Sequence, residues 1–324
     1  MLSVQIAEYG KPWDVVRVVE VREPRAPKEG EIKIQMLAAP IHPADLLMMR
    51  GFYGKRPQLP TAMGGEGVAL VIEAGPGAVA QPGDRVIIPY GQDTWSERLT
   101  ISAQAAIRVP DGLDDAQASM AIINPLTARL MLTEFVSLMP GEFVIQNAAN
   151  SSVGRAVIAI AKSRGLRTIN VVRRPELVEE LKHAGGDIVV LDGPDLPKQV
   201  VEATQRAPIR LGLDGVGGEA MRSLTGVLAE NGMLVVYAGM SAQPGVAFPP
   251  HLIFRNLTVR GFWLIKWFAD AAPEVAQQIQ RELLPLLVSG AINVPIEATF
   301  PLSEAREAVS RAGKATGKVL FRAA

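Results

Sequence analysis

Small and polar residues fill the eight-residue turn from Asn147 to Gly154. The apolar run Phe143-Val144-Ile145 before this turn has the length of a buried strand. After it, apolar residues between Val153 and Ala161 recur at the spacing of one buried helix face. A helix N-terminus offers free backbone N–H groups, which hold a phosphate when the surrounding residues are small. The pattern predicts a pyrophosphate site. An ordinary strand–helix turn stays an alternative, because only Gly154 remains of the usual G-x-G-x-x-G.

Two arginines, Arg173 and Arg174, follow the next strand-like run, Thr168–Val172. In a dinucleotide-binding unit that selects NAD, an acidic residue about 20 residues beyond the turn binds the ribose hydroxyls. Guanidinium groups at this place instead suit the 2′-phosphate of NADP through charge-assisted, paired hydrogen bonds. The sequence therefore favours NADPH as the cofactor. Two arginines that only solvate a strand end are the alternative.

The elements around this turn alternate between strand and helix. The strand, turn, helix and second strand from Phe143 to Arg174 form a βαβ unit, the first unit of a Rossmann domain. Continued alternation predicts a doubly wound parallel sheet with helices on both faces. The further strands are expected at 188–191, 211–214, 233–237 and 257–262, and the helices at 177–183, 200–205 and 220–229.

The N-terminal third has a different pattern. Short β runs with Gly and Pro between them extend from Leu2 to about Ile107 and predict a compact, barrel-like β domain. A last strand at Lys318–Arg322 is expected to return to this domain. We predict residues 1–118 for the first part of the catalytic β domain, 119–256 for the Rossmann domain, and 257–324 for the return.

Composition limits the classes of function. The 324 residues include 33 basic and 33 acidic side chains and no cysteine. Zero net charge gives no reason to expect nucleic acid or a membrane as partner, and no apolar run reaches the roughly 18 residues of a spanning helix. The N-terminus lacks the pattern of a secretory signal. Without cysteine, disulfides, thiol catalysis and a four-Cys zinc lobe are excluded. A cytoplasmic enzyme is expected.

The order of these parts resembles the medium-chain dehydrogenase/reductase superfamily. Several stretches together resemble the mitochondrial-type trans-2-enoyl thioester reductases of fatty-acid synthesis, and the resemblance covers nearly the whole chain. These stretches are IHPADLLMMRGFYG (41–54), GGEGVA (64–69), QNAANSSVG (146–154), INVVRR (169–174), VVYAGM (235–240) and LTVRGFWL (257–264).

The resemblance implies an α/β fold in which a GroES-like β-barrel domain accompanies the Rossmann domain. It implies NADPH-dependent reduction of the 2,3 double bond of enoyl thioesters, carried by coenzyme A or by acyl carrier protein. It also implies a homodimer formed through residues 257–262. Two other functions remain open. The protein could be a zinc-free quinone or enone reductase, or it could bind NADPH without catalysing a reaction. NADPH consumption with crotonyl-CoA, with a quinone or with neither would separate the three.

The resemblance also assigns roles to residues. Tyr53 would donate the proton to the α carbon, whereas without the resemblance it would be read as a tyrosine packing a loop. Asn124 could equally cap a helix, Trp263 could belong to the core, and Lys318 could be solvated. Ser152 and Arg174 stand where the family commonly has Gly and Asp. The implied cofactor contacts are Asn124, Asn150, Ser151, Ser152, Val153, Gly154, Arg173, Arg174, Tyr237, Ala238, Gly239, Met240, Phe262, Trp263, Leu264 and Lys318.

A catalytic zinc is not expected. Zinc-dependent alcohol dehydrogenases of the superfamily usually hold the metal with Cys, His and Cys, and such a site needs about three protein ligands. His42 stands at the first of these positions, but Gly65 replaces the expected histidine and the chain has no cysteine. We therefore predict a zinc-free enzyme in which His42 is an ordinary loop residue.

Overall fold

The computed structural model describes residues 1–323, which form two compact units. Unit 1 comprises Met1–Ile123, Gln277–Ser289 and the segment from Asn293 onward, and unit 2 comprises Asn124–Ala276 and Gly290–Ile292. The sequence analysis placed the two main domain boundaries at 118/119 and 256/257, whereas in the structure the chain passes from one unit to the other at 123/124 and 276/277. The second crossing is later because residues 258–261 still form a strand of the unit 2 sheet.

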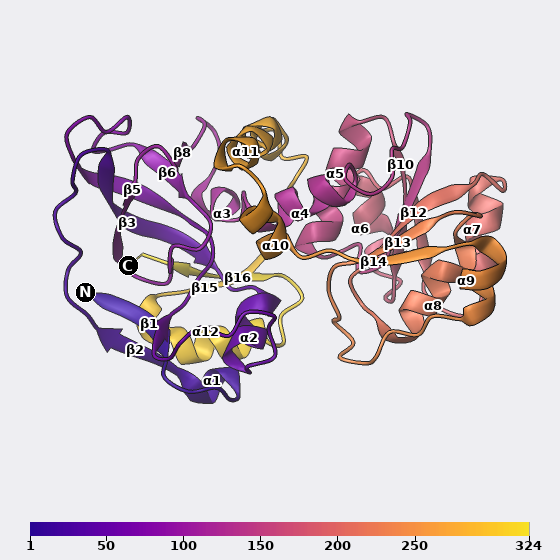
Figure 1. The fold of residues 1–324 in the computed structure, drawn as a ribbon, viewed down its shortest axis with the longest axis horizontal. Coiled ribbons are helices and arrows are strands. Elements are labelled where there is room, and N and C mark those ends of the chain that lie inside the picture. Colours follow the sequence, from indigo (N-terminus) through magenta and orange to yellow (C-terminus); the bar gives the residue numbers. More distant parts are fainter. Residues whose placement is uncertain (324) are drawn as a thin grey trace. The chain divides into compact units, whose positions relative to one another are not determined.

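Unit 2 contains a six-stranded parallel sheet with the strand order β11-β10-β9-β12-β13-β14 (Figure 1). Its central strands β9, β10 and β12 are almost entirely buried, as expected where helices cover both faces, and all neighbouring strands are parallel, so the prediction of a doubly wound parallel sheet is confirmed. The bounds are β9 (Phe143–Gln146), β10 (Arg167–Val172), β11 (Ile188–Leu191), β12 (Ile209–Asp214), β13 (Met233–Val236) and β14 (Thr258–Gly261).

The helices of unit 2 connect these strands. The predicted helices at 177–183, 200–205 and 220–229 are present, with shifted ends for the last two. The sequence missed α9, which buries none of its residues and therefore shows no apolar period. The bounds are α4 (Ile123–Met131), α5 (Ser152–Ser163), α6 (Leu177–His183), α7 (Leu196–Thr204), α8 (Gly218–Val227), α9 (Pro249–Arg255) and α10 (Leu264–Asp270).

Unit 1 is built on two β-sheets. One has the order β2-β1-β4, and the other has the order β15-β16-β3-β5-β6-β8 with β7 also paired to β3. The C-terminal strand β16 pairs antiparallel with β3, which confirms the predicted return of Lys318–Arg322 (Figure 1). The bounds are β1 (Leu2–Ile6), β2 (Val16–Glu20), β3 (Glu31–Pro40), β4 (Thr61–Ala62), β5 (Gly67–Ala74), β6 (Arg85–Ile88), β7 (Arg98–Ser102), β8 (Ile107–Arg108), β15 (Ile296–Phe300) and β16 (Lys318–Arg322).

Helices complete unit 1. The sequence analysis did not predict the helix that precedes the Tyr53 loop. This helix, α2 (Pro43–Met49), begins with a proline and packs Leu46 and Met49 into the unit 1 core. The same core holds Trp95 and Phe321, whose rings meet edge to face with centroids 5.0 Å apart. The other helices are α1 (Pro12–Val15), α3 (Asp115–Ala118), α11 (Pro273–Val288), which crosses between the units, the 3₁₀ helix η1 (Leu302–Glu304) and α12 (Ala305–Ala312).

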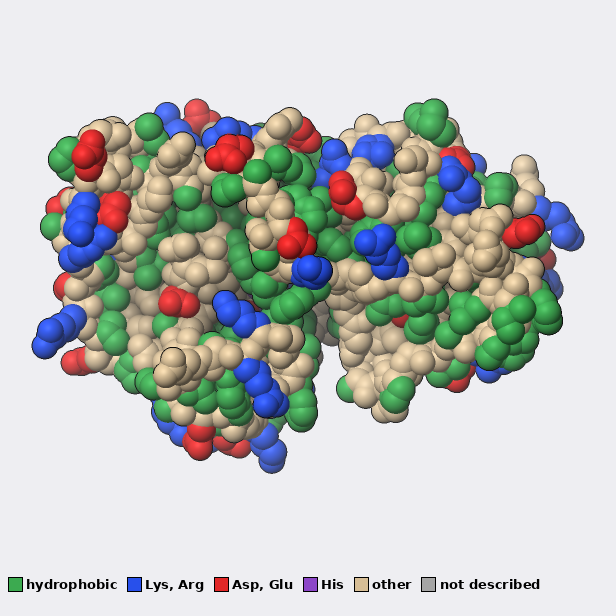
Figure 2. Space-filling view, in the orientation of Figure 1, with side chains coloured by type: hydrophobic (Ala, Val, Ile, Leu, Met, Phe, Trp, Pro, Cys, Tyr) green, Lys and Arg blue, Asp and Glu red, His purple; other side chains and the backbone are tan. Residues whose placement is uncertain are grey.

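The surface of each unit carries both signs of charge. Figure 2 shows Lys and Arg interspersed with Asp and Glu, in line with the equal counts in the sequence. Within residues 1–323, no helix has both the length and the apolar character that crossing a membrane requires.

Candidate active site

The turn after β9 forms the N-terminus of α5 in unit 2. Ser151 caps this helix, and its hydroxyl accepts a hydrogen bond from the Gly154 N–H at 3.1 Å. A Cβ at position 154 would lie 2.4 Å from the carbonyl oxygen of Ala149, so only glycine fits there. Ser152 and Val153 lie in the first turn of the helix, where backbone N–H groups have no partner within the helix. The turn therefore has the close packing and the donors that a pyrophosphate needs.

A buried clamp, made by the side chains of Asn147 and Asp214, fixes the backbone next to this turn. The strand order reverses between β9 and β12, which is the point where such sheets bind nucleotides. Asn147, after β9, donates through Nδ2 to Oδ1 of Asp214 at 2.7 Å, and its Oδ1 accepts from the Gly215 N–H at 2.8 Å. The same Asp214 oxygen accepts from the N–H groups of Val216 and Gly217. The sequence analysis missed this clamp, although an aspartate ending an apolar strand before Gly215 was a usable signal.

The two arginines that are predicted to bind the 2′-phosphate lie at the carboxyl end of β10, the neighbour of β9. Arg173 and Arg174 directly follow this strand, and both are exposed. The Nε of Arg174 lies 3.7 Å from a carboxylate oxygen of Glu176, which is a weak surface pair. Both guanidinium groups are therefore accessible to an anionic ligand at the edge of the sheet.

Two further predicted segments follow β13 and β14 at the same edge of the sheet. The Tyr237 side chain hydrogen-bonds to Ser151, and burial raises the pKa of Tyr237. Ala238, Gly239 and Met240 after it are exposed. The Phe262 ring packs edge to face against Phe135 with centroids 5.8 Å apart. Trp263 is 38% exposed, which does not fit the alternative of a core residue, whereas Leu264 is buried.

Asn124 lies in the first turn of α4 and is buried. The helix begins one residue earlier, so Asn124 does not occupy the capping position. Its Nδ2 atom is buried and has no hydrogen-bond partner among the residues that the structure describes. A buried amide donor of this kind fits an oxygen of a bound ligand.

Tyr53 belongs to unit 1, on a loop that α2 holds in place. The chain leaves α2 through hydrogen bonds from the Gly51 N–H to Met48 and from the Phe52 N–H to Leu47, at 2.9 and 3.0 Å. Gly51 has φ +73°, a conformation that favours glycine. Tyr53 itself is half-buried, in the polar surroundings of a second tyrosine, Tyr90.

Tyr90 is a residue that the sequence analysis missed. Burial raises its pKa, and the nearby Tyr53, Asp45 and Glu66 raise it further. Its ring lies against Gly65, where an added Cβ would be 3.4 Å from a ring carbon. The surroundings of Tyr53 therefore contain a second phenol, which stays protonated at neutral pH.

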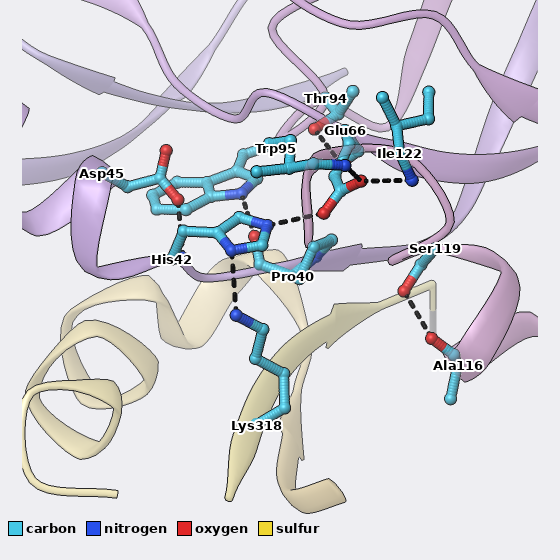
Figure 3. A network of polar contacts seen from close by, with 11 residues as sticks. Pro40, His42, Asp45, Glu66, Thr94, Trp95, Ala116, Ser119, Ile122 and Lys318 are labelled. Carbon is cyan, nitrogen blue, oxygen red and sulfur yellow. Dashed lines mark hydrogen bonds and ion pairs between the residues drawn. The ribbon is translucent and has the colours of Figure 1, made fainter. Parts of the chain in front are cut away.

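A buried polar network lies at the start of α2 (Figure 3). The Nε2 atom of His42 is 2.7 Å from Oε1 of Glu66, and Nζ of Lys318 is 2.9 Å from His42 Nδ1. A Lys318 ammonium that donates to Nδ1 leaves the ring proton on Nε2, which then donates to Glu66. The prediction that His42 is an ordinary loop residue is wrong, because its side chain is buried between two charged groups that distant parts of the chain supply.

Burial shapes the titration of this network. It lowers the pKa of Lys318 to about 8, although the carboxylates of Glu66 and Asp45 act in the opposite direction. It also raises the pKa of Asp45, which His42 and Lys318 oppose. Lys318 thus remains charged at neutral pH, and the imidazole ring joins its amine to the Glu66 carboxylate by two hydrogen bonds.

The network does not fit a catalytic zinc. Both ring nitrogens of His42 are engaged, one by Glu66 and one by Lys318. Among residues 1–323 no group of three or more His, Cys, Asp or Glu side chains is arranged to hold a metal ion.

The structure separates the predicted site residues into two sets. The turn after β9, the arginines after β10 and the segments after β13 and β14 all lie at the carboxyl edge of the unit 2 sheet. Tyr53 and Lys318 belong to unit 1. The contact of Lys318 with a cofactor phosphate stays a prediction, and the structure gives its amine a different partner, His42.

Two family models match the chain. The alcohol dehydrogenase GroES-like domain matches residues 28–111, and the zinc-binding dehydrogenase model matches residues 152–281. The human mitochondrial enoyl-[acyl-carrier-protein] reductase is 39% identical over 323 residues, covering 96% of this chain and 86% of the human protein. The resemblance inferred from the sequence is thereby confirmed.

Solved structures agree with this similarity. A complex of Etr1p with NADP and crotonyl-CoA has a TM-score of 0.87 and 26% identity, covering 99% of both chains. The crystal structure of a candidate NADPH:quinone reductase from Bacillus thuringiensis has a TM-score of 0.89 and 28% identity, covering 100% of this chain and 99% of the other.

The prediction of a cytoplasmic location is wrong. The human relative and its counterparts from rat, cattle and Dictyostelium discoideum are all mitochondrial by name. The prediction rested on composition and net charge, which do not distinguish one aqueous compartment from another. The relatives point to mitochondria instead.

Proposed function

Because this chain belongs to the family of mitochondrial enoyl-[acyl-carrier-protein] reductases, within the medium-chain dehydrogenase/reductase superfamily, we propose that it reduces the 2,3 double bond of trans-2-enoyl thioesters with NADPH. The observation that carries the proposal is the gathering of a phosphate-type turn and two accessible arginines at the carboxyl edge of the unit 2 sheet. The acyl group is carried by coenzyme A or by acyl carrier protein.

The residues of unit 2 fit the cofactor. The N-terminal turn of α5, from Asn150 to Gly154, receives the pyrophosphate. Arg173 and Arg174 pair with the 2′-phosphate. The unpartnered amide of Asn124 donates to a cofactor oxygen, and the segments Tyr237–Met240 and Phe262–Leu264 flank the nicotinamide. When bound, NADPH supplies a hydride to the β carbon of the substrate.

Tyr53 completes the reaction by supplying a proton. Hydride addition to the β carbon moves an electron pair through the α carbon onto the thioester oxygen. The Tyr53 hydroxyl then donates its proton to the α carbon, and the phenolate recovers a proton from water. Tyrosine suits this step because a phenol ordinarily titrates near pH 10 and is therefore a proton donor at neutral pH.

The direct test is NADPH consumption by the purified protein with crotonyl-CoA as substrate. Butyryl-CoA, which lacks the double bond, is the matched control and should give no consumption. The reduced product is identified by mass, with one added hydride and one added proton. A protein that consumes no NADPH with any trans-2-enoyl thioester would refute the proposal.

A second candidate is an NADPH:quinone reductase. The similarity to the Bacillus thuringiensis structure favours it, because this similarity covers the whole chain. The same assay with a quinone in place of crotonyl-CoA separates the two activities. Consumption with the quinone alone would place this candidate first.

A homodimer is part of the proposal. Strand β14 lies at the edge of the unit 2 sheet, and all four of its residues are exposed. An exposed edge strand offers unpaired backbone N–H and C=O groups to another chain. Two copies of β14 related by a two-fold axis would hide both edges. Light scattering that gives the mass of a single chain would contradict this assembly.

A further inference from the structure

Lys318, His42 and Glu66 form a buried chain of three ionisable groups that the proposed reaction does not use. Their exposed fractions are 7%, 4% and 1%. They come from the first residue of β16, the residue before α2 and the residue before β5. Figure 3 shows the imidazole lying between the amine and the carboxylate.

Such a network is costly, because each buried charge loses its hydration. The structure offsets part of this cost with hydrogen bonds to the imidazole and to the carboxylate. Besides the bond to His42, Glu66 accepts from the backbone N–H groups of Ile122 and Ile123 at 3.0 and 2.8 Å. The carboxylate is thereby immobilised, and it holds the imidazole at a fixed position.

His42 is also the N-cap of α2. Its backbone N–H donates to Oδ2 of Asp45 at 2.7 Å, so the backbone of His42 is tied to the first turn of the helix. The ring is held from both sides, by Glu66 and by Lys318. The start of α2 therefore cannot shift without breaking a buried, charge-assisted hydrogen bond.

The other end of α2 leads directly into the Tyr53 loop. Its last turn continues through the bonds from Gly51 to Met48 and from Phe52 to Leu47. Tyr53 follows immediately in the sequence. A helix of this length transmits a displacement of its first residue to its last, because the backbone hydrogen bonds keep it rigid.

We propose that Lys318, His42 and Glu66 are positioning residues, which fix the N-terminus of α2 and thereby the place of Tyr53. This proposal rests on the proposed role of Tyr53 as proton donor. It differs from the role that the family resemblance implied for Lys318, a contact with a cofactor phosphate. The two roles predict different effects of the same substitution.

Lys318→Met keeps the apolar stem and removes the charge. As a positioning residue, Lys318 predicts that kcat falls about 10²-fold, the size expected from a misplacement of about 1 Å at a reacting group. The Kd of NADPH should stay within about twofold of the parent value. His42→Gln should have the same effects, and the double variant should be no worse than either single one, because both remove the same network. Lys314→Met, at an exposed lysine near the end of α12, is the matched control.

Amide hydrogen exchange supplies a readout that does not depend on activity. Residues 43–53 should exchange faster in Lys318→Met and His42→Gln than in the control, with the rest of unit 1 unchanged. A uniform increase across unit 1 would mean that the network is only structural, and would overturn the proposal.

NADPH titration separates the two roles of Lys318. A Lys318→Met protein that binds NADPH weakly and NADH normally would assign the lysine to the phosphate and overturn the positioning role. If the parent protein reduces no enoyl thioester, the proposed function fails instead, whereas the exchange experiment still decides whether the network holds α2.

Discussion

Replacing Lys318 by methionine should remove a pH dependence from the stability of this protein. Burial lowers the pKa of the Lys318 amine to about 8 in the folded chain, from an ordinary value of 10.5. Between these two values the unfolded chain binds more protons than the folded chain, so the free energy of unfolding rises with pH. Well below pH 8 both states are protonated, and well above pH 10.5 both are neutral, so the contribution is constant in those two ranges.

The size of the effect follows from these two pKa values. A single group that titrates at about 8 when folded and at 10.5 when unfolded adds on the order of 1 kcal/mol to the free energy of unfolding between pH 7 and pH 9. This corresponds to a change of up to about tenfold in the unfolding equilibrium constant. The free energy of unfolding rises with pH because the folded state holds the charged amine at a cost. This cost disappears when the amine loses its proton.

Urea unfolding at pH 7, 8 and 9 measures this contribution. The parent protein and the Lys314→Met control should become more stable with pH relative to Lys318→Met, by on the order of 1 kcal/mol over the range. Groups outside the network of Lys318, His42, Glu66 and Asp45 titrate in the same way in all three proteins and cancel in the comparison. Parallel curves for the parent and Lys318→Met would refute the reasoning, because they would mean that the folded chain leaves the pKa of this amine unchanged.

Four further predictions concern the cofactor, the turn, the proton donor and the metal. NADPH should bind more tightly than NADH, and alanine at Arg173 or Arg174 should cost about 1.5–3 kcal/mol of NADPH binding; equal affinities in a titration of the parent would contradict this. Gly154→Ala should weaken NADPH binding and lower stability by about 1–3 kcal/mol, because the new Cβ meets a backbone carbonyl at 2.4 Å. Gly226→Ala, where the added Cβ would make only an ordinary contact of 3.5 Å with His251, is its control in thermal unfolding. Tyr53→Phe should bind NADPH as the parent does and turn over crotonyl-CoA about 10²–10⁴-fold more slowly; near-parental turnover of the folded variant would exclude the phenol from the reaction. Activity should survive exhaustive chelation. A rate that depends on added zinc would show that His42 binds a metal, against the argument from its two engaged ring nitrogens.

The periodic part of this fold could be predicted from the sequence. The strands of unit 2 are short apolar runs because both faces of a parallel sheet are covered, and the α6 bounds, 177–183, match the structure. Helix α9 could not be found in this way, because it buries no residue. The boundary at 276/277, where the chain returns to unit 1, could not be predicted either, because the exposed strand β14 fits the start of a new domain equally well.

The site divides along the same line. Residues after β9, β10, β13 and β14 could be grouped from the sequence, because the carboxyl ends of parallel strands meet at one edge. The network of His42, Glu66 and Lys318 could not, because Lys318 and the His42 side chain that it contacts are 276 residues apart along the chain. Only the pairing of β16 with β3 brings the lysine to the histidine.

The cost of Lys318 is itself an argument for a role beyond stability. The lowered pKa of Lys318 means that its charged form opposes folding at neutral pH. Methionine at this position removes this cost, and Glu66 keeps its hydrogen bonds to His42 and from the backbone N–H groups of Ile122 and Ile123, so that its charge stays compensated. The variant should therefore stay close to the parent in stability at pH 7. A variant that keeps its stability and its affinity for NADPH but loses turnover would be hard to explain by packing alone. That combination follows directly if the network holds α2, and with it Tyr53, in place.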